Sequence, residues 1–223
     1  MKVSEAIATR KSVRAFKPDA VARETIEAIL ALAARAPSGG NLQPWKVYVL
    51  IGKTRDALVR RVAEKRVERP MGEAPEYKIY PPGLTEPYRT RRHAIGEAMY
   101  AALGIAREDR AGRLKHFARN WEFFGAPVGL IFTIDRQMQP GQWADVGMFM
   151  QNIMLLAREH GLDTCPQESW ATFHSVIREY LGVPENEMVF CGMAIGYADE
   201  TAPVSGLVSD RAALGEFAIF PQK

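Results

Sequence analysis

Hydrophobic and polar positions along the chain follow helical spacing in some segments and extended spacing in others. Ile26, Ile29, Leu30 and Ala33 recur at the period of a helix, whereas 45–51 is rich in β-branched and aromatic residues and predicts a strand. By the same reasoning, we expect helices near 4–7, 26–33, 53–69, 91–105, 108–124, 143–160 and 171–181, and strands near 45–51, 128–134, 162–166, 188–197 and 217–220.

These elements predict an α+β fold, in which helices cover a sheet. The runs 128–134 and 188–197 are apolar enough to be buried strands, and 188–197 is expected at the centre of the sheet. The segment 143–160 is apolar almost all round, which is typical of a helix enclosed by protein on most sides. A length of 223 residues suits one domain spanning 1–223.

The segment 70–87 contains five prolines and shows no regular pattern. A loop of this length within a compact domain is usually a functional lid or a disordered insert. We favour a lid, as part of a lid or insert region at about 63–122.

Composition narrows the range of partners. The 29 basic and 26 acidic side chains give a weak overall field, so nucleic acid is not an implied partner. Glu5 interrupts any apolar export signal, and no run approaches the ~20 residues that cross a membrane, so we expect a cytoplasmic protein. Cys165 and Cys191 are too few for a disulfide framework and are expected to be buried thiols.

Several common catalytic motifs are absent. The chain has no phosphate loop of the Walker type, no Gly-x-Gly-x-x-Gly turn, no His-Glu-x-x-His helix and no Gly-x-Ser-x-Gly elbow. Histidines 93, 116, 160 and 174 lack metal-ligand spacing, so we expect surface or capping roles for them and assign no metal.

Two segments carry candidate chemistry. Arg10, Ser12 and Arg14 alternate along an extended segment, so two guanidiniums and a hydroxyl would converge on one side and suit a phosphate monoester. In 36–45, two glycines allow close backbone approach and Ser38 and Asn41 offer polar groups, which suits a planar heterocycle. Taken alone, the Arg10–Arg14 run is more typical of a solvated basic face. Taken alone, 36–45 fits an ordinary helix-to-strand turn as well as a binding loop.

Together, the two segments resemble the FMN-dependent nitroreductase family. Residues 10–16 match its Arg-x-Ser-x-Arg-x-Phe motif, and 37–45 match its Pro-Ser-x-x-Asn-x-Gln-Pro-Trp motif. The likeness continues through 124–127, 151–155, 161–168, Gly192 and Gly196. It implies the nitroreductase fold, with a central, mostly antiparallel sheet flanked by helices, and an intertwined homodimer with FMN at the subunit interface.

The resemblance also implies roles for individual residues. Arg10, Ser12 and Arg211 would hold the FMN phosphate, and Arg14 would lie near the pyrimidine edge of the flavin. Some relatives carry a lysine where this chain has Ser209, so phosphate binding would depend more on Arg10 and Arg211. The remaining flavin contacts would come from Pro166, Gln167 and Glu168 beside the ring, Gln142 at its polar edge, and Pro37, Ser38 and Asn41 of the other subunit.

The resemblance further implies that a backbone N–H near Glu168 donates to flavin N5. It also implies that 217–220 extends onto the partner subunit. NADH or NADPH would reduce FMN and leave, after which a nitroaromatic or quinone would take the electrons. Flavin reduction for a partner enzyme, reductive dehalogenation, flavin destruction and a non-catalytic flavin-binding module stay open as alternatives.

The candidate lid supplies groups for an aromatic acceptor. Tyr88 and Arg89 are the predicted substrate residues, with tyrosines 77 and 80 and arginines 91 and 92 close in the sequence. The same residues are equally typical of a solvated helix start.

Overall fold

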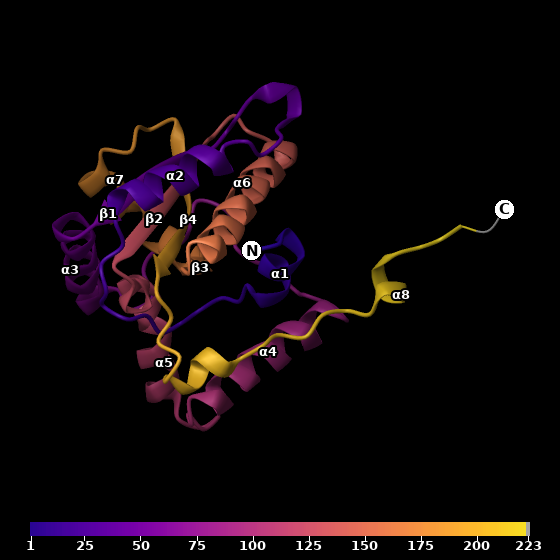
Figure 1. Cartoon of the computed structure of the whole chain (residues 1–223). Helices are drawn as coiled ribbons and strands as arrows, with labels where there is room; N and C mark the ends of the chain where they lie inside the picture. Colours follow the sequence, from indigo (N-terminus) through magenta and orange to yellow (C-terminus); the bar gives the residue numbers. More distant parts are fainter. Residues whose placement is uncertain (222–223) are drawn as a thin grey trace.

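One four-stranded sheet lies at the centre of the computed structural model, which describes residues 1–221 (Figure 1). Its strands are β1 (Lys46–Ile51), β2 (Val128–Asp135), β3 (Asp163–Gln167) and β4 (Glu187–Gly196), in the order β1-β2-β4-β3. All three strand pairs are antiparallel, and β4 lies between β2 and β3. The predicted α+β class, the antiparallel sheet and the inner position of 188–197 are confirmed.

The helices begin and end close to the predicted positions. The α-helices are α1 (Val3–Thr9), α2 (Arg23–Ala33), α3 (Lys53–Glu68), α4 (Tyr88–Ala102), α5 (Arg110–Ala118), α6 (Pro140–Glu159), α7 (His174–Leu181) and α8 (Leu214–Phe217). Short 3-10 helices are η1 (Gly39–Asn41), η2 (Arg119–Gly125), η3 (Glu168–Phe173) and η4 (Pro203–Gly206). The helix predicted over 108–124 is therefore divided into α5 and η2.

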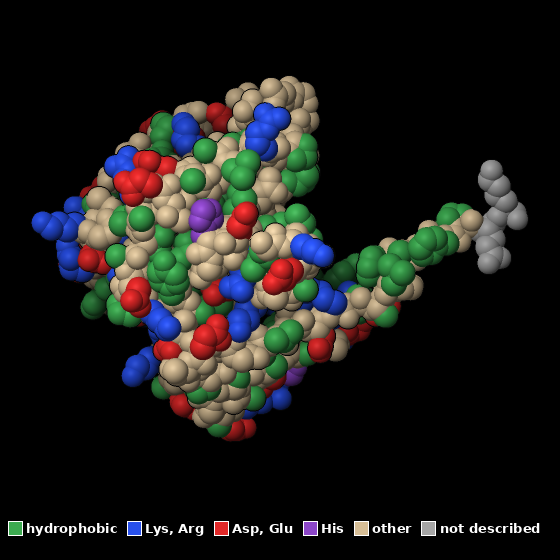
Figure 2. Space-filling view, viewed as in Figure 1, with side chains coloured by type: hydrophobic (Ala, Val, Ile, Leu, Met, Phe, Trp, Pro, Cys, Tyr) green, Lys and Arg blue, Asp and Glu red, His purple; other side chains and the backbone are tan. Residues whose placement is uncertain are grey.

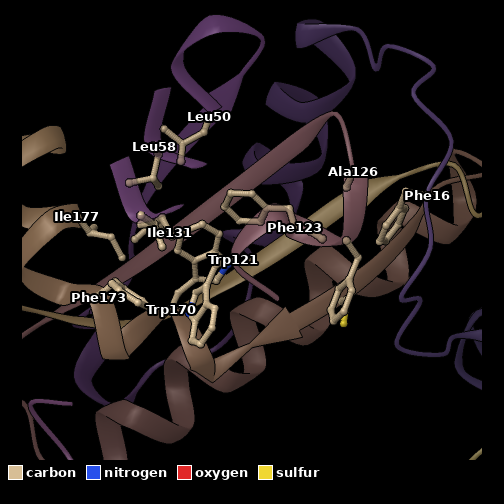
Figure 3. Packing of buried hydrophobic residues seen from close by; sticks show 14 of the residues in the cluster. Phe16, Leu50, Leu58, Trp121, Phe123, Ala126, Ile131, Trp170, Phe173 and Ile177 are labelled. Atoms are coloured by element: carbon tan, nitrogen blue, oxygen red, sulfur yellow. The ribbon is translucent and has the colours of Figure 1, made fainter. Parts of the chain in front are cut away.

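The two faces of the sheet carry separate hydrophobic cores. Leu130 and its neighbours on one face pack against α2 and α6. Ile131 points to the other face, where α3, α7, η2 and η3 cover it with the aromatic cluster shown in Figure 3. This alternation along β2 is expected of a strand that is covered on both sides.

Two glycines in the sheet make room for an aromatic pair. Phe123 of η2 and Trp170 of η3 are fully buried and stacked, with ring centroids 4.3 Å apart. A Cβ atom at Gly129 would lie 2.4 Å from the Phe123 ring, and one at Gly192 would lie 2.3 Å from the Trp170 ring. Because these contacts are far below van der Waals distance, glycine allows both rings to rest on the sheet.

A bulge in β4 connects the sheet to the segment 70–87. The pairing with β2 shifts between Phe132 and Thr133, which leaves Phe190 without a register partner. The Tyr77 hydroxyl donates to the Phe190 carbonyl oxygen at 2.6 Å, and its ring packs edge-on against Trp143. Burial raises the pKa of the Tyr77 phenol, so it stays a hydrogen-bond donor.

The first half of 70–87 is thus anchored to the body. The Glu73 N–H donates to the Thr172 carbonyl at 2.8 Å, and Glu76 accepts from Arg136 and from the Val189 N–H. A lid role stays a prediction, and within the described chain 78–87 makes no hydrogen bond to the sheet.

The expectation of a strand near the C-terminus differs from the structure. Residues 217–220 do not form the predicted strand, because Phe217 ends α8 and no strand of the described chain lies beside the segment to accept its hydrogen bonds. The α6 helix is buried or half-buried over most of its length, and Ala144, Gly147 and Met148 form an exposed stripe on one side. Within residues 1–221, every helix is too short or too polar to span a lipid bilayer.

Candidate active site

The segment carrying Arg10, Ser12 and Arg14 runs beside the first residues of β3. Ser12 forms a parallel bridge with Thr164, and the Val13 N–H donates to the Thr164 carbonyl at 3.0 Å. Val13 is buried in the core, as the predicted alternation requires. The sheet edge therefore fixes this segment in an extended conformation.

Arg10 and Arg14 of this segment form a cationic cluster with Arg211. Burial lowers the pKa of the Arg10 guanidinium, and the nearby charge of Arg211 lowers it further. The Arg211 Nη1 donates to Ser209 Oγ at 2.6 Å, so the serine orients the guanidinium. Within residues 1–221, neither Arg10, Arg14 nor Arg211 forms an ion pair with a carboxylate. Unpaired guanidiniums held together in this way favour an anionic ligand.

A cavity of about 720 Å³ opens next to this cluster. Arg14, Pro166, Gln167 and Glu168 line it, so four predicted site residues are brought together. Most of the other lining side chains are apolar, among them Met99, Phe117, Phe124, Met150, Met154 and Phe190. An apolar cavity with a few charged groups is typical of a site for a small aromatic molecule.

The turn from β3 into η3 is held by the Gln167 side chain. This side chain is buried, its Nε2 donates to the Asn120 carbonyl at 2.6 Å, and its Oε1 accepts from Trp170 Nε1 at 3.4 Å. Burial raises the pKa of the adjacent Glu168 carboxyl, which lines the cavity. The stacked pair of Phe123 and Trp170 therefore positions the cavity wall, because Trp170 is hydrogen-bonded to Gln167.

His116 corrects one prediction from the sequence. It is neither a surface nor a capping residue, because it is buried and lines the cavity. Burial lowers its pKa to about 4, and the charges of Arg119 and Arg14 act in the same direction. The imidazole is therefore neutral near pH 7, and its buried Nε2 has no hydrogen-bond partner within the described chain.

The other predicted flavin contacts form a separate group at the beginning of α6. The Gly39 N–H donates to the buried Asp145 carboxylate at 3.1 Å, and Ser38 Oγ accepts from the Gln43 N–H at 3.0 Å. Gln142 lies in the first turn of α6 near this loop, and Pro37 and Asn41 are exposed. None of Pro37, Ser38, Asn41 and Gln142 lines the cavity of the same chain.

The comparisons with known proteins decide the family. The family model described as "Nitroreductase family" matches residues 7–197, which is most of the chain. The chain belongs to the nitroreductase family. The chloronitrobenzene nitroreductase of Comamonas testosteroni is 39% identical over 98% of this chain and 96% of its own length.

Solved structures of nitroreductases share the fold over the whole chain. The FMN and NADPH-dependent nitroreductase NfnB from Sphigopyxis sp. strain HMH has a TM-score of 0.96 at 48% identity and covers 100% of both chains. The FMN-dependent nitroreductase NfnB from Mycobacterium smegmatis, solved in complex with NADPH, has a TM-score of 0.92 at 35% identity and covers 99% of this chain and 98% of its own. The predicted family and fold are confirmed.

The predicted substrate residues of this nitroreductase family member lie outside the cavity wall. Tyr88 is 60% exposed at the beginning of α4, and Arg89 pairs with Glu86 at 2.7 Å. Tyr80 and Arg92 line the cavity instead. Of the predicted aromatic and basic residues, the structure of a single chain therefore favours Tyr80 and Arg92. A role for Tyr88 and Arg89 stays a prediction.

Sequence reasoning missed part of the cavity wall. The apolar pattern of 143–160 predicts core packing for its methionines, yet Met150 and Met154 line the cavity. His116 and Asn120 lie in the region of about 63–122, where the family motifs do not extend, and no spacing in the sequence marks them.

Proposed function

We propose that this protein is an FMN-dependent NAD(P)H oxidoreductase that reduces nitroaromatic acceptors. The observation that carries the proposal is the unpaired cluster of Arg10, Arg14 and Arg211 beside an apolar cavity of about 720 Å³. Nitroreductases named for chloronitrobenzene and for FMN and NADPH dependence match nearly all of the chain, which supports the same cofactor and the same acceptor class.

The residues present fit FMN. A phosphate monoester would relieve the repulsion between Arg10 and Arg211, and the Ser12 hydroxyl would add a donor. The cavity lined by Arg14 and by Pro166–Glu168 would receive the flavin ring. When bound, FMN supplies hydride exchange between a nicotinamide and an electron acceptor.

The chain's own groups would orient the cofactor and stabilise charge. The Arg14 guanidinium, held by its hydrogen bond to the Ser12 carbonyl at 3.0 Å, would offset negative charge on the reduced ring. The backbone N–H near Glu168 would donate to the ring, because the Gln167 side chain fixes the turn that presents it. Apolar walls formed by Met150 and Phe124 would exclude water.

The active form is proposed to be a homodimer. Ala144, Gly147 and Met148 give α6 an exposed apolar stripe at helical spacing. Residues 214–221 form a C-terminal arm that projects from the body and carries mostly hydrophobic side chains (Figure 2). Phe217 is 69% exposed and Phe220 is 79% exposed, and large exposed apolar groups of this kind mark an interaction surface.

A homodimer would also explain the separate loop at the beginning of α6. Pro37, Ser38, Asn41 and Gln142 do not reach the cavity of their own chain, so they would contact the FMN held mainly by the partner. The bond between Gly39 and Asp145 would keep this loop in position for that contact.

Anaerobic spectroscopy tests the proposed function. Purified protein should bind FMN, NADPH or NADH should bleach its flavin absorbance, and nitrobenzene should then restore it. Chromatography in the same buffer measures the oligomeric state. Bound FMN that neither nicotinamide reduces would refute the reductase proposal, and failure to bind FMN would refute the cofactor assignment.

A further inference from the structure

The three arginines near the beginning of α4 differ in their partners. Arg89 pairs with Glu86 at 2.7 Å, and Arg91 pairs with Glu216 at 2.8 Å. Arg92 forms no ion pair with any carboxylate of residues 1–221. Of the three, it is also the arginine that lines the cavity. Its charge is therefore available to a ligand.

Tyr80 holds the Arg92 guanidinium at the cavity wall. The guanidinium carbon lies 4.0 Å from the centroid of the Tyr80 ring, which is a close cation–π contact. Stacking covers one face of the planar guanidinium and leaves its N–H edges free to donate. Those edges match the two oxygens of a carboxylate, which can accept a pair of parallel hydrogen bonds.

We propose that Arg92, oriented by Tyr80, recognises an anionic substituent on the aromatic acceptor, and that this protein prefers nitroaromatic carboxylates to their neutral analogues. The inference rests on the proposed function of the same cavity. Arg14 also lines the cavity, but it is bonded to the Ser12 carbonyl and lies beside the flavin site, which leaves Arg92 as the guanidinium for the acceptor.

The remaining titratable groups of the cavity agree with an anionic acceptor. His116 is neutral near pH 7 because its pKa is about 4. Burial raises the pKa of Glu168, which carries the single carboxyl group of the cavity lining. The lining therefore carries the positive charges of Arg14 and Arg92 against one carboxyl group.

Equilibrium binding tests the inference without turnover. Benzoate and benzamide have similar shapes and cannot accept hydride through a nitro group, so they can be titrated into the FMN-loaded protein and followed by the flavin difference spectrum or by calorimetry. Benzoate should bind more tightly. In Arg92→Gln, its dissociation constant should rise about tenfold, as loss of one exposed charge-assisted hydrogen-bonding group predicts, whereas that of benzamide should change less than about threefold.

Matched variants separate charge from geometry. Arg107→Gln removes an exposed arginine from the same region but outside this cavity, and it should leave both dissociation constants unchanged. Arg92→Lys should restore only part of the preference, because an ammonium cannot stack or donate as a planar fork. Tyr80→Ala should weaken benzoate about two- to fivefold, whereas Tyr80→Phe should retain the preference.

A kinetic experiment distinguishes the acceptor's carboxylate from a phosphate of the electron donor. In stopped flow, Arg92→Gln should slow reoxidation of the reduced protein by 4-nitrobenzoate but not by 4-nitrobenzamide, and it should leave reduction by NADPH and NADH unchanged. Slower reduction by NADPH alone would assign Arg92 to the donor and overturn the inference. Equal binding of benzoate and benzamide by the unmodified protein would also overturn it.

The two proposals fail in different ways. Preferential, Arg92-dependent binding of benzoate by a protein that does not reduce nitroaromatics would refute the proposed function and support the anion site. Reduction of nitrobenzene and 4-nitrobenzoate with equal efficiency, unchanged in Arg92→Gln, would support the function and refute the anion site.

Discussion

Gly192→Ala is expected to destabilise the fold and the active site together. Gly192 lies opposite both Ile131 and Gln167 in the sheet, and the added methyl group would lie 2.3 Å from the Trp170 ring. An ordinary contact needs more than 1 Å of additional separation. Trp170 cannot retreat, because it is fully buried and stacked on Phe123 at 4.3 Å.

The expected cost follows from overpacking of a rigid core. Inserting one methylene group into a close-packed interior typically costs about 1–3 kcal/mol. The upper end of this range applies here because the Trp170 ring is held between the sheet and its aromatic neighbours. We therefore expect the free energy of unfolding to fall by about 3 kcal/mol. For a chain of this length, that loss lowers the unfolding midpoint by roughly 6–12 °C. Displacement of Trp170 would also break its bond to Gln167 and weaken FMN binding.

Thermal unfolding at a fixed protein concentration measures this cost. Gly206→Ala is the control, because a Cβ atom there meets nothing within 4 Å, and it should change stability by less than about 0.5 kcal/mol. A double-mutant cycle with Trp170→Leu isolates the clash. If Gly192→Ala costs the same in the presence and the absence of the tryptophan ring, the steric explanation is wrong.

Three further predictions concern the proposed site. Arg10→Ala should mainly raise the dissociation constant for FMN, measured by flavin fluorescence. Arg14→Ala should also shift the flavin reduction potential, measured by redox titration. Equal effects of the two variants on both quantities would contradict these separate roles. His116 has a folded pKa of about 4, below its ordinary 6.5, so stability should fall by about 2–3 kcal/mol between pH 7 and pH 4, and pH-dependent unfolding of His116→Phe should lack this loss. Met148→Arg should give a monomer with weakened FMN binding, and a dimeric variant by chromatography would argue against α6 as the interface.

The sequence predicted the parts of the fold that depend on local periodicity. The strand over 188–197 was expected to be central, and β4 is paired on both sides. The alternation from Arg10 to Arg14 predicted an extended segment, and Ser12 of this segment forms a parallel bridge with Thr164 of β3. In both segments, the alternation of side chains follows from the extended backbone that pairs with the sheet. The order of polar and apolar residues in the sequence is therefore sufficient to predict it.

The missed features depend on contacts between distant segments. His116 looks like any polar residue of an amphipathic helix, and only the packing of α5 against η2 shows that its ring is buried. Phe217–Phe220 has the composition of a strand but lacks a neighbouring strand within the described chain. Whether such a segment pairs depends on what lies beside it, which periodicity does not report.

Strained backbone conformations lie in two turns near the proposed FMN site. Within residues 1–221, the non-glycine residues with positive φ are Asn41, Gln43, Phe123 and Phe124, and all four lie in the η1 loop or in η2. Such conformations cost about 1–3 kcal/mol each and persist only where the surrounding structure holds them. Phe123 is held by its stack on Trp170, and the Phe124 carbonyl accepts from Arg119 while its ring lines the cavity. The stack on Trp170 thus holds the strained turn of η2, and the hydrogen bond from Gly39 to Asp145 holds the η1 loop. Substitutions that relax either turn should impair FMN binding before they unfold the sheet.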